Sequence, residues 1–284
     1  MKEQILYKTA AIDGLEIFYR EAGTAERPLL LLLHGFPSSS HMYRDLIADL
    51  SEAYHIIAPD YPGFGQSSMP GIKQFSYTFD NLSVIMERFI DHLQLRDINL
   101  YIQDYGGPIG LRIATRRPQL IQSLIIQNAN AYNEGLGDAL EPLITYIQQP
   151  DAAHEQAARF FLTLEATRWL YLNGAHDQAR ISPDSYITDQ YYLDRAGNDE
   201  IQLALFLDYG NNLALYDEWH AYFKKHQPKT MVVWGKNDAL FIAPGGEAYR
   251  KDLPNAEIIQ IDGGHFLLEE HHAYVAGLIN RFIS

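Results

Sequence analysis

The stretch that decides the fold is Asn99-Leu100-Tyr101-Ile102-Gln103-Asp104-Tyr105-Gly106-Gly107-Pro108-Ile109-Gly110. Its first part belongs to a short run, residues 98–103, that predicts a buried strand. Asp104 follows directly, and the two glycines after Tyr105 predict a sharp turn into a helix that packs closely on the strand. We therefore expect Asp104 at a strained strand-to-helix turn, where the free N–H groups of the helix keep its carboxylate ionised.

Other short runs along the chain have the same buried-strand character and alternate with segments of helical period, such as residues 82–93 and 110–116. This alternation predicts a mostly parallel sheet flanked by helices. The dipeptide Asp13-Gly14 suits a tight hairpin, so two antiparallel strands should precede the parallel part. The later strands are expected at residues 29–33, 55–59, 98–103, 123–127, 230–234 and 257–261.

The alternation stops between residue 131 and about residue 222. Apolar residues there recur at helical spacing, and several prolines and glycines interrupt them, which predicts short helices rather than strands. The strand pattern then resumes, and a helix near residues 273–282 ends the sheet-forming part. We expect an eight-stranded α/β core made of residues 1–130 and 223–284, with residues 131–222 inserted as a helical cap, or lid.

The composition limits the partners. With 22 lysines and arginines against 36 aspartates and glutamates, the formal net charge is −14, which disfavours nucleic acid and anionic membranes and favours neutral or cationic small molecules. The first residues lack the basic start and apolar core of a signal peptide, and no apolar run approaches the roughly 18 residues that span a bilayer. We therefore expect a soluble, cytoplasmic protein with a small-molecule partner.

The candidate nucleophile is Asp104. The chain has no cysteine, and no serine has glycine at both the second position before it and the second position after it. A carboxylate attacks saturated carbon and forms an alkyl ester, which suits epoxides and alkyl halides, whereas ester and amide hydrolysis usually employs serine or cysteine. The structural alternative is that Asp104 only caps the following helix.

Three further signals lie where other predicted strands end. The turn His34-Gly35-Phe36-Pro37 can aim the Phe36 N–H at the same point as the Tyr105 N–H, which together would form an oxyanion hole. Asp238 and His265 follow two successive strands, so both can converge with Asp104 at the carboxyl edge of the sheet. The chain order nucleophile, acid, histidine is the order expected for this arrangement.

With these motifs, and with the segment 60–67 after the second parallel strand, nearly the whole chain resembles α/β-hydrolases of the epoxide hydrolase and haloalkane dehalogenase group. The resemblance implies an α/β-hydrolase fold and a catalytic triad. Asp104 would be the nucleophile, His265 would activate water against the ester, and Asp238 would orient His265. The alternative acid position holds Asn128 and Asn130, which cannot carry the charge.

The resemblance leaves the substrate open. Gln103 before Asp104 is similar to dehalogenases, but those enzymes hold the halide with an indole beside the nucleophile and commonly an asparagine in the His-Gly-x-Pro turn, where this chain has Tyr105 and Phe36. Epoxide hydrolases polarise the leaving oxygen with two cap tyrosines. The candidate substrate-binding residues of the cap are Tyr209, Tyr216, Tyr146 and, as an indole donor, Trp169.

We therefore expect an epoxide hydrolase for a small to medium apolar substrate, with a haloalkane dehalogenase and a non-catalytic ligand-binding protein as alternatives. No cofactor or metal is expected, because the chain lacks a phosphate-binding loop and a dinucleotide motif. His271 and His272 are adjacent on a predicted helix and point about 100° apart, so they fit a solvated helix start better than a metal site.

Overall fold

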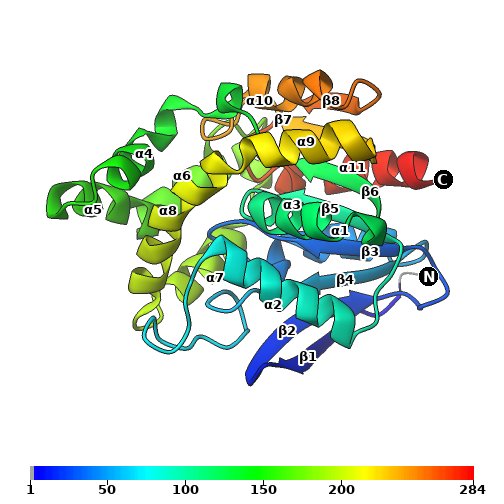
Figure 1. Cartoon of the computed structure of the whole chain (residues 1–284), viewed down its shortest axis with the longest axis horizontal. Helices are drawn as coiled ribbons and strands as arrows, with labels where there is room; N and C mark the ends of the chain where they lie inside the picture. Colours follow the sequence, from blue (N-terminus) through cyan, green and yellow to red (C-terminus); the bar gives the residue numbers. More distant parts are fainter. Residues whose placement is uncertain (1–2) are drawn as a thin grey trace.

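The computed structural model describes residues 3–284 and contains one mixed sheet with helices packed on its faces (Figure 1). The sheet has eight strands in the order β1-β2-β4-β3-β5-β6-β7-β8. The strands are β1 (Leu6–Ile12), β2 (Leu15–Ala22), β3 (Leu29–Leu33), β4 (His55–Pro59), β5 (Ile98–Gln103), β6 (Ile121–Gln127), β7 (Lys229–Gly235) and β8 (Glu257–Ile261).

The strand directions confirm the predicted fold class. β2 pairs antiparallel with β1 and β4, while β4, β3, β5, β6, β7 and β8 are parallel to one another. Asp13 and Gly14 both have positive φ, 50° and 81°, in the hairpin between β1 and β2, as a tight turn of this type requires. The parallel arrangement brings the carboxyl ends of β3, β5, β6, β7 and β8 to one edge of the sheet.

The helices begin earlier than their apolar periodicity predicts. α2 starts at Phe79 because the Thr78 hydroxyl accepts a hydrogen bond from the Asn81 N–H at 3.1 Å, and such caps carry no apolar signal. The helices are α1 (Arg44–Leu50), α2 (Phe79–His92), α3 (Gly106–Arg116), α4 (Glu141–Gln148), α5 (Ala152–Ala158), α6 (Leu164–Leu172), α7 (Pro183–Leu193), α8 (Asn198–Ala214), α9 (Tyr216–His226), α10 (Ala243–Ala248) and α11 (Leu268–Ile283).

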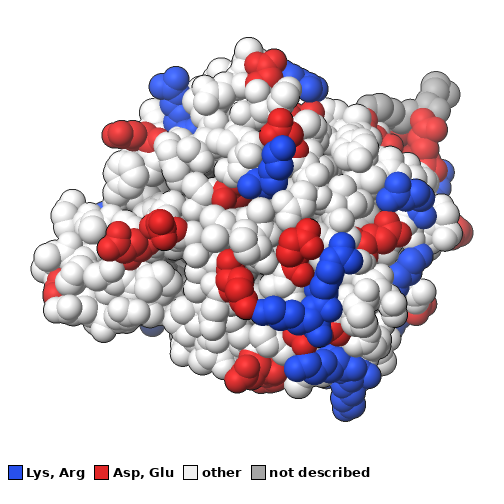
Figure 2. All heavy atoms as spheres, turned by 90° about the horizontal axis from the view of Figure 1, so that it is seen from above, with Lys and Arg blue, Asp and Glu red and all other residues white. Residues whose placement is uncertain are grey.

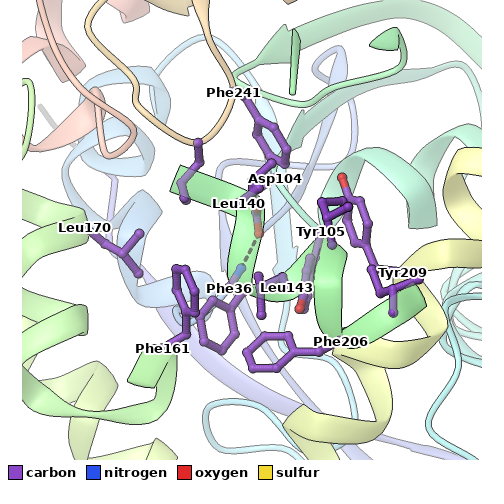
Figure 3. Close-up of a pocket in the computed structure, with 13 residues that line it drawn as sticks. Phe36, Asp104, Tyr105, Leu140, Leu143, Phe161, Leu170, Phe206, Tyr209 and Phe241 are labelled. Atoms are coloured by element: carbon purple, nitrogen blue, oxygen red, sulfur yellow. Dashed lines mark hydrogen bonds between the residues drawn. The ribbon is translucent and has the colours of Figure 1, made fainter. Parts of the chain in front are cut away.

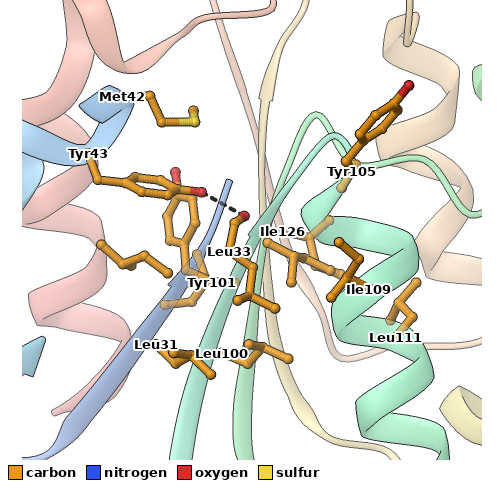
Figure 4. Close-up of a cluster of buried hydrophobic side chains, with 14 of the residues drawn as sticks. Leu31, Leu33, Met42, Tyr43, Leu100, Tyr101, Tyr105, Ile109, Leu111 and Ile126 are labelled. Carbon is orange, nitrogen blue, oxygen red and sulfur yellow. Dashed lines mark hydrogen bonds between the residues drawn. The ribbon is translucent and has the colours of Figure 1, made fainter. Parts of the chain in front are cut away.

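The core lies between the central strands and the helices on either side (Figure 4). Leu33 on β3 and Ile126 on β6 are fully buried beside Ile109 of α3, and each such side chain contributes about 1.5–3 kcal/mol by leaving water. The Tyr43 hydroxyl donates to the Leu33 carbonyl at 2.8 Å, at the end of β3. The end of β3, which precedes the turn that carries Phe36, is therefore anchored to the core.

The chain between β6 and β7, residues 128–228, contains helices and loops rather than further sheet strands, and we call it the helical insertion. Within it α8 packs against α4, and α6 packs against α7, while α9 packs against α3 of the core. Helices α4 to α8 lie together at one side of the sheet (Figure 1). The division of the chain into a core and a cap at residues 131 and 222 stays a prediction.

The beginning of α11 joins this insertion to the core. The Glu269 carboxylate accepts hydrogen bonds from Arg44 at 2.8 and 3.0 Å and from the Ser185 hydroxyl at 2.8 Å. The Glu270 carboxylate accepts from the backbone N–H groups of residues 176 and 177. The predicted solvated helix start is therefore wrong, because the acidic residues there bind partners from the insertion.

On the face shown in Figure 2, acidic and basic side chains lie interspersed. Among residues 3–284, no helix is both long and apolar enough to cross a membrane.

Candidate active site

Asp104 lies at the turn from β5 into α3, with a positive φ of 47°. A non-glycine residue in this region is strained, and such strain is characteristic of functional turns. The turn depends on Gly106, because a Cβ there would lie 2.1 Å from the Leu33 carbonyl oxygen. The sequence thus builds the expected elbow, which presents the Asp104 side chain at the carboxyl edge of the sheet.

Two backbone N–H groups hold the Asp104 carboxylate. The Phe36 N–H donates to Asp104 Oδ1 at 2.6 Å (Figure 3), and the Tyr105 N–H also donates to this carboxylate. These are the two donors expected from the sequence for an oxyanion hole. The same donors can hold a negative charge that develops on Oδ1 when the carboxyl carbon is attacked.

His265 lies between two carboxylates. Its Nδ1 is 2.7 Å from Asp238 Oδ2, and its Nε2 is 3.9 Å from Asp104 Oδ2. All three side chains are buried. The structure therefore brings together Asp104, Asp238 and His265, and the contact with Asp238 leaves Nε2 directed toward the candidate nucleophile.

Asn128 supports Asp238, a contact that sequence reasoning missed. Its side-chain amide donates to Asp238 Oδ2 at 2.8 Å, and its Oδ1 accepts from the Gly235 N–H at 2.8 Å. The N–H groups of Leu240 and Phe241 donate to the other Asp238 oxygen. From the sequence, Asn128 is only the alternative acid position. Its contact with Asp238 depends on how β6 and β7 pair, which no local pattern reveals.

Burial and charge act in opposite directions on the titrating groups. Burial raises the pKa of Asp104 above its ordinary value, although His265 and the N–H groups of Phe36 and Tyr105 oppose this. The helix N-terminus therefore offsets burial only in part. Burial lowers the pKa of His265, but the charge and hydrogen bond of Asp238, together with Asp104, outweigh burial and raise it.

A narrow, mostly apolar cavity opens above Asp104 (Figure 3). Its volume is about 40 Å³, a few times the room that one water needs, about 10–15 Å³. Besides Asp104 the wall consists of Phe36, Tyr105, Leu140, Leu143, Ile144, Ile147, Phe161, Leu170, Phe206, Tyr209, Leu240 and Phe241. The geometry fits a small apolar molecule placed against the carboxylate.

The four candidate cap residues lie at different distances from this cavity. Tyr209 lines it, and its hydroxyl shares a hydrogen bond with the Tyr216 hydroxyl. Asn130 donates to the same Tyr216 oxygen at 3.0 Å. The structure therefore links two of the candidate tyrosines in one polar chain that ends at the cavity.

Tyr146 and Trp169 lie outside the cavity wall. Successive helix residues point about 100° apart, and α4 directs Ile147 rather than Tyr146 into the cavity, while α6 directs Leu170 rather than Trp169. Tyr146 instead forms a hydrogen bond with Glu155. The predicted role of these two residues in substrate binding has no support in this geometry.

Within residues 3–284, no three or more His, Asp or Glu side chains lie together in a group that could hold a metal ion. The site is built from a buried carboxylate, an imidazole with its carboxylate partner, and two aimed N–H groups. This arrangement can support nucleophilic attack followed by histidine-assisted attack of water.

The fold and the site define an α/β-hydrolase. The family described as alpha/beta hydrolase fold matches residues 28–272. Since this match covers most of the sequence, the chain belongs to that family.

Several known proteins are similar over nearly the full length. An uncharacterised hydrolase of Saccharomyces cerevisiae is 39% identical over 274 residues, covering 95% of this chain and 94% of the relative. A haloalkane dehalogenase of Psychrobacter cryohalolentis is 28% identical, covering 95% and 88%. The crystal structure of the haloalkane dehalogenase DbeA from Bradyrhizobium elkani matches with a TM-score of 0.80 and 25% identity, covering 99% of each chain.

Proposed function

We propose that this chain hydrolyses small apolar epoxides through an alkyl ester on Asp104. That it is a hydrolase of the α/β-hydrolase fold follows from the family and from the hydrolase relatives. The observation that carries the proposal is the position of the Asp104 carboxylate at the apolar cavity. Its Oδ1 is 2.6 Å from the Phe36 N, and its Oδ2 is 3.9 Å from His265 Nε2.

In the first step Asp104 Oδ2 bonds to a ring carbon of the epoxide, and the bond from that carbon to the ring oxygen breaks. The oxygen takes a proton from the Tyr209 hydroxyl. Burial raises the pKa of Tyr209 well above its ordinary value, so this phenol is protonated when the epoxide binds. Asn130 donates to the Tyr216 oxygen, which leaves the Tyr216 proton free to support Tyr209 as charge develops on it.

In the second step His265 takes a proton from water, and the water oxygen attacks the carboxyl carbon of Asp104. The negative charge forms on Oδ1, where the Phe36 and Tyr105 N–H groups lie. The ester bond then breaks, and the departing oxygen takes the proton from His265, which releases a diol. The second proton of the water is then on the Asp104 carboxyl group, and it passes to the Tyr209 phenolate left by the first step. Asp104, His265 and Tyr209 thereby regain their starting protonation states.

Dehalogenation of small haloalkanes by the same ester is the second candidate. The dehalogenase relatives favour it, because their match extends over nearly the whole chain. Against it, the cavity wall contains two tyrosines, Tyr105 and Tyr209, but no indole or amide side chain. A tyrosine hydroxyl can donate either to the epoxide oxygen or to a departing halide. Haloalkanes are therefore tested as substrates beside epoxides.

The test is to incubate the His265→Phe variant with panels of small epoxides and haloalkanes and to record its intact mass. A trapped epoxide adds its full mass, whereas a trapped haloalkane adds its mass minus the hydrogen halide. The double variant Asp104→Asn/His265→Phe is the control and should gain no mass. Absence of an adduct with both panels would overturn the covalent mechanism and favour ligand binding without catalysis.

A further inference from the structure

Gln103, the last residue of β5, contacts the ring of His265. Its side chain is fully buried, and its Nε2 lies 2.9 Å from His265 Nε2. Its Oε1 is also buried but has no hydrogen-bond partner within residues 3–284. A buried acceptor without a partner is costly, so this carboxamide is arranged for something other than packing.

The same carboxamide lies beside the candidate nucleophile. A Cβ at Gly35 would be 2.2 Å from Gln103 Oε1 and 2.6 Å from Asp104 Oδ1. Both oxygens therefore border the same small space, which is left free because residue 35 is glycine. Gln103 thus reaches His265 with one end and the neighbourhood of Asp104 Oδ1 with the other.

The protonation of His265 decides which end of the carboxamide fits. Nδ1 faces the Asp238 carboxylate and carries a proton, so Nε2 of the neutral ring is an acceptor, and the Gln103 NH₂ group can donate to it. Once His265 has taken a proton from water, Nε2 becomes a donor, and two donors face each other. A half-turn of the carboxamide then brings Oε1 to Nε2 and the NH₂ group toward Asp104 Oδ1.

We propose that Gln103 is a positioning residue for His265, whose carboxamide donates to the neutral imidazole and, after a half-turn, accepts from the protonated one during hydrolysis of the ester. This inference rests on the proposed function, since it concerns the second step. The half-turn gives the unpartnered Oε1 a charged donor and places the NH₂ group where negative charge develops. Gln103 would thereby favour the protonated state of His265 that the step requires.

Gln127 on β6 offers a matched control. It pairs in register with Gln103 and is equally buried. Its Oε1 accepts a hydrogen bond from the Tyr101 hydroxyl, and its Nε2 donates to the His265 backbone carbonyl at 3.4 Å. Both ends of Gln127 have partners and neither touches the imidazole ring, so its replacement reports a purely structural loss.

The test compares Gln103→Leu, Gln103→Glu and Gln127→Leu in single-turnover experiments that follow the ester by mass. Gln103→Leu should form the ester at nearly the normal rate but hydrolyse it about 10- to 100-fold more slowly, the range expected for a lost hydrogen bond to a charged group. Gln103→Glu keeps the acceptor and should recover much of this loss. Gln127→Leu should lower the unfolding temperature without selective accumulation of the ester.

A titration of the His265 ring by NMR, without substrate, gives a second measurement. Gln103→Leu should lower the pKa of His265 by about one unit, and Gln103→Glu should raise it. Normal ester hydrolysis together with an unchanged or raised pKa in folded Gln103→Leu would overturn the inference. Absence of any trapped ester in His265→Phe would instead overturn the proposed function, and the titration would still report on Gln103.

Discussion

The Ser38 hydroxyl donates a hydrogen bond to the Asp189 carboxylate across a distance of 3.2 Å, and this bond joins the end of the turn that carries Phe36 to the helical insertion. The Tyr171 hydroxyl donates to the other Asp189 oxygen. The Tyr171 ring in turn stacks on Phe266, with centroids 3.8 Å apart and planes inclined by 7°. Asp189 therefore connects the insertion with both the turn that carries Phe36 and the loop that carries His265.

The first prediction concerns the pH dependence of stability. Burial raises the pKa of Asp189 to about 7, although hydrogen bonds from Tyr171 and Ser38 and the charge of Arg44 oppose this, while Glu269 adds to it. The folded state then holds a proton that the unfolded state has lost above about pH 4. Stability attributable to this group is present at low pH and is lost as the pH rises to 7.

Asp189→Asn removes the charge; its amide oxygen can accept from one of the two hydroxyls, and its NH₂ group can donate to the oxygen of the other. Relative to the unchanged protein, it should gain about 2 kcal/mol of unfolding free energy between pH 5 and pH 8. Urea unfolding at both pH values measures this difference, with the exposed Asp184→Asn on the same helix as control. An equal effect of Asp189→Asn at both pH values would show that the carboxyl group does not titrate in this interval.

The second prediction concerns the pH dependence of the reaction. His265 must be neutral to take a proton from water, and its pKa lies above the ordinary value of about 6.5. Ester hydrolysis should therefore fall about tenfold per pH unit below a midpoint higher than 6.5. Asp238→Asn removes the strongest interaction that raises this pKa, so the midpoint should move to lower pH. A profile that is unaffected by Asp238→Asn would exclude His265 as the titrating base.

The sheet could be predicted because each strand carries its own local signal. Residues 29–33 match β3 residue for residue, since a strand buried on both faces has a continuous apolar run. Residues 98–103 match β5 as well, although Asn99 and Gln103 interrupt its apolar residues. Helix starts were less predictable. α11 begins at Leu268. Glu269 and Glu270 in its first turn have partners from α1 and from the insertion, and contacts so distant in sequence leave no periodic pattern.

The residues proposed for the triad and the oxyanion hole carry a signal in the sequence, because each lies within four residues of a strand end and has turn-forming neighbours. The residues of the cavity wall could not be predicted from the sequence. Phe161 and Phe206 look like ordinary core residues, and only the packing of the short helices decides that they face Asp104. Whether Tyr146 or Ile147 enters the cavity depends on the rotation of α4 about its axis, because adjacent helix residues point about 100° apart.

The third prediction concerns the elbow itself. Gly106→Ala would place a Cβ 2.1 Å from the Leu33 carbonyl oxygen, so the start of α3 must move away from the end of β3, at a cost of about 3 kcal/mol or more. Gly277→Ala in α11 is the control, because a Cβ there meets no atom within 4 Å and should stabilise the helix by up to about 1 kcal/mol. Thermal unfolding measures both. Equal stabilities of the two variants would contradict the tight approach at the elbow.

The fourth prediction separates the two candidate substrates. Tyr209→Phe removes the hydroxyl at the cavity but keeps the ring, so epoxide opening should slow about 10²- to 10⁴-fold, the range for a lost general acid. Formation of the ester from a haloalkane needs no proton and should slow far less. The measurement is the rate of ester formation in the His265→Phe background with each substrate. Tyr146→Phe, whose hydroxyl lies outside the cavity, is the matched control. Equal slowing with both substrates would mean that Tyr209 shapes the cavity rather than donates a proton, and slowing by Tyr146→Phe alone would move the acid to α4.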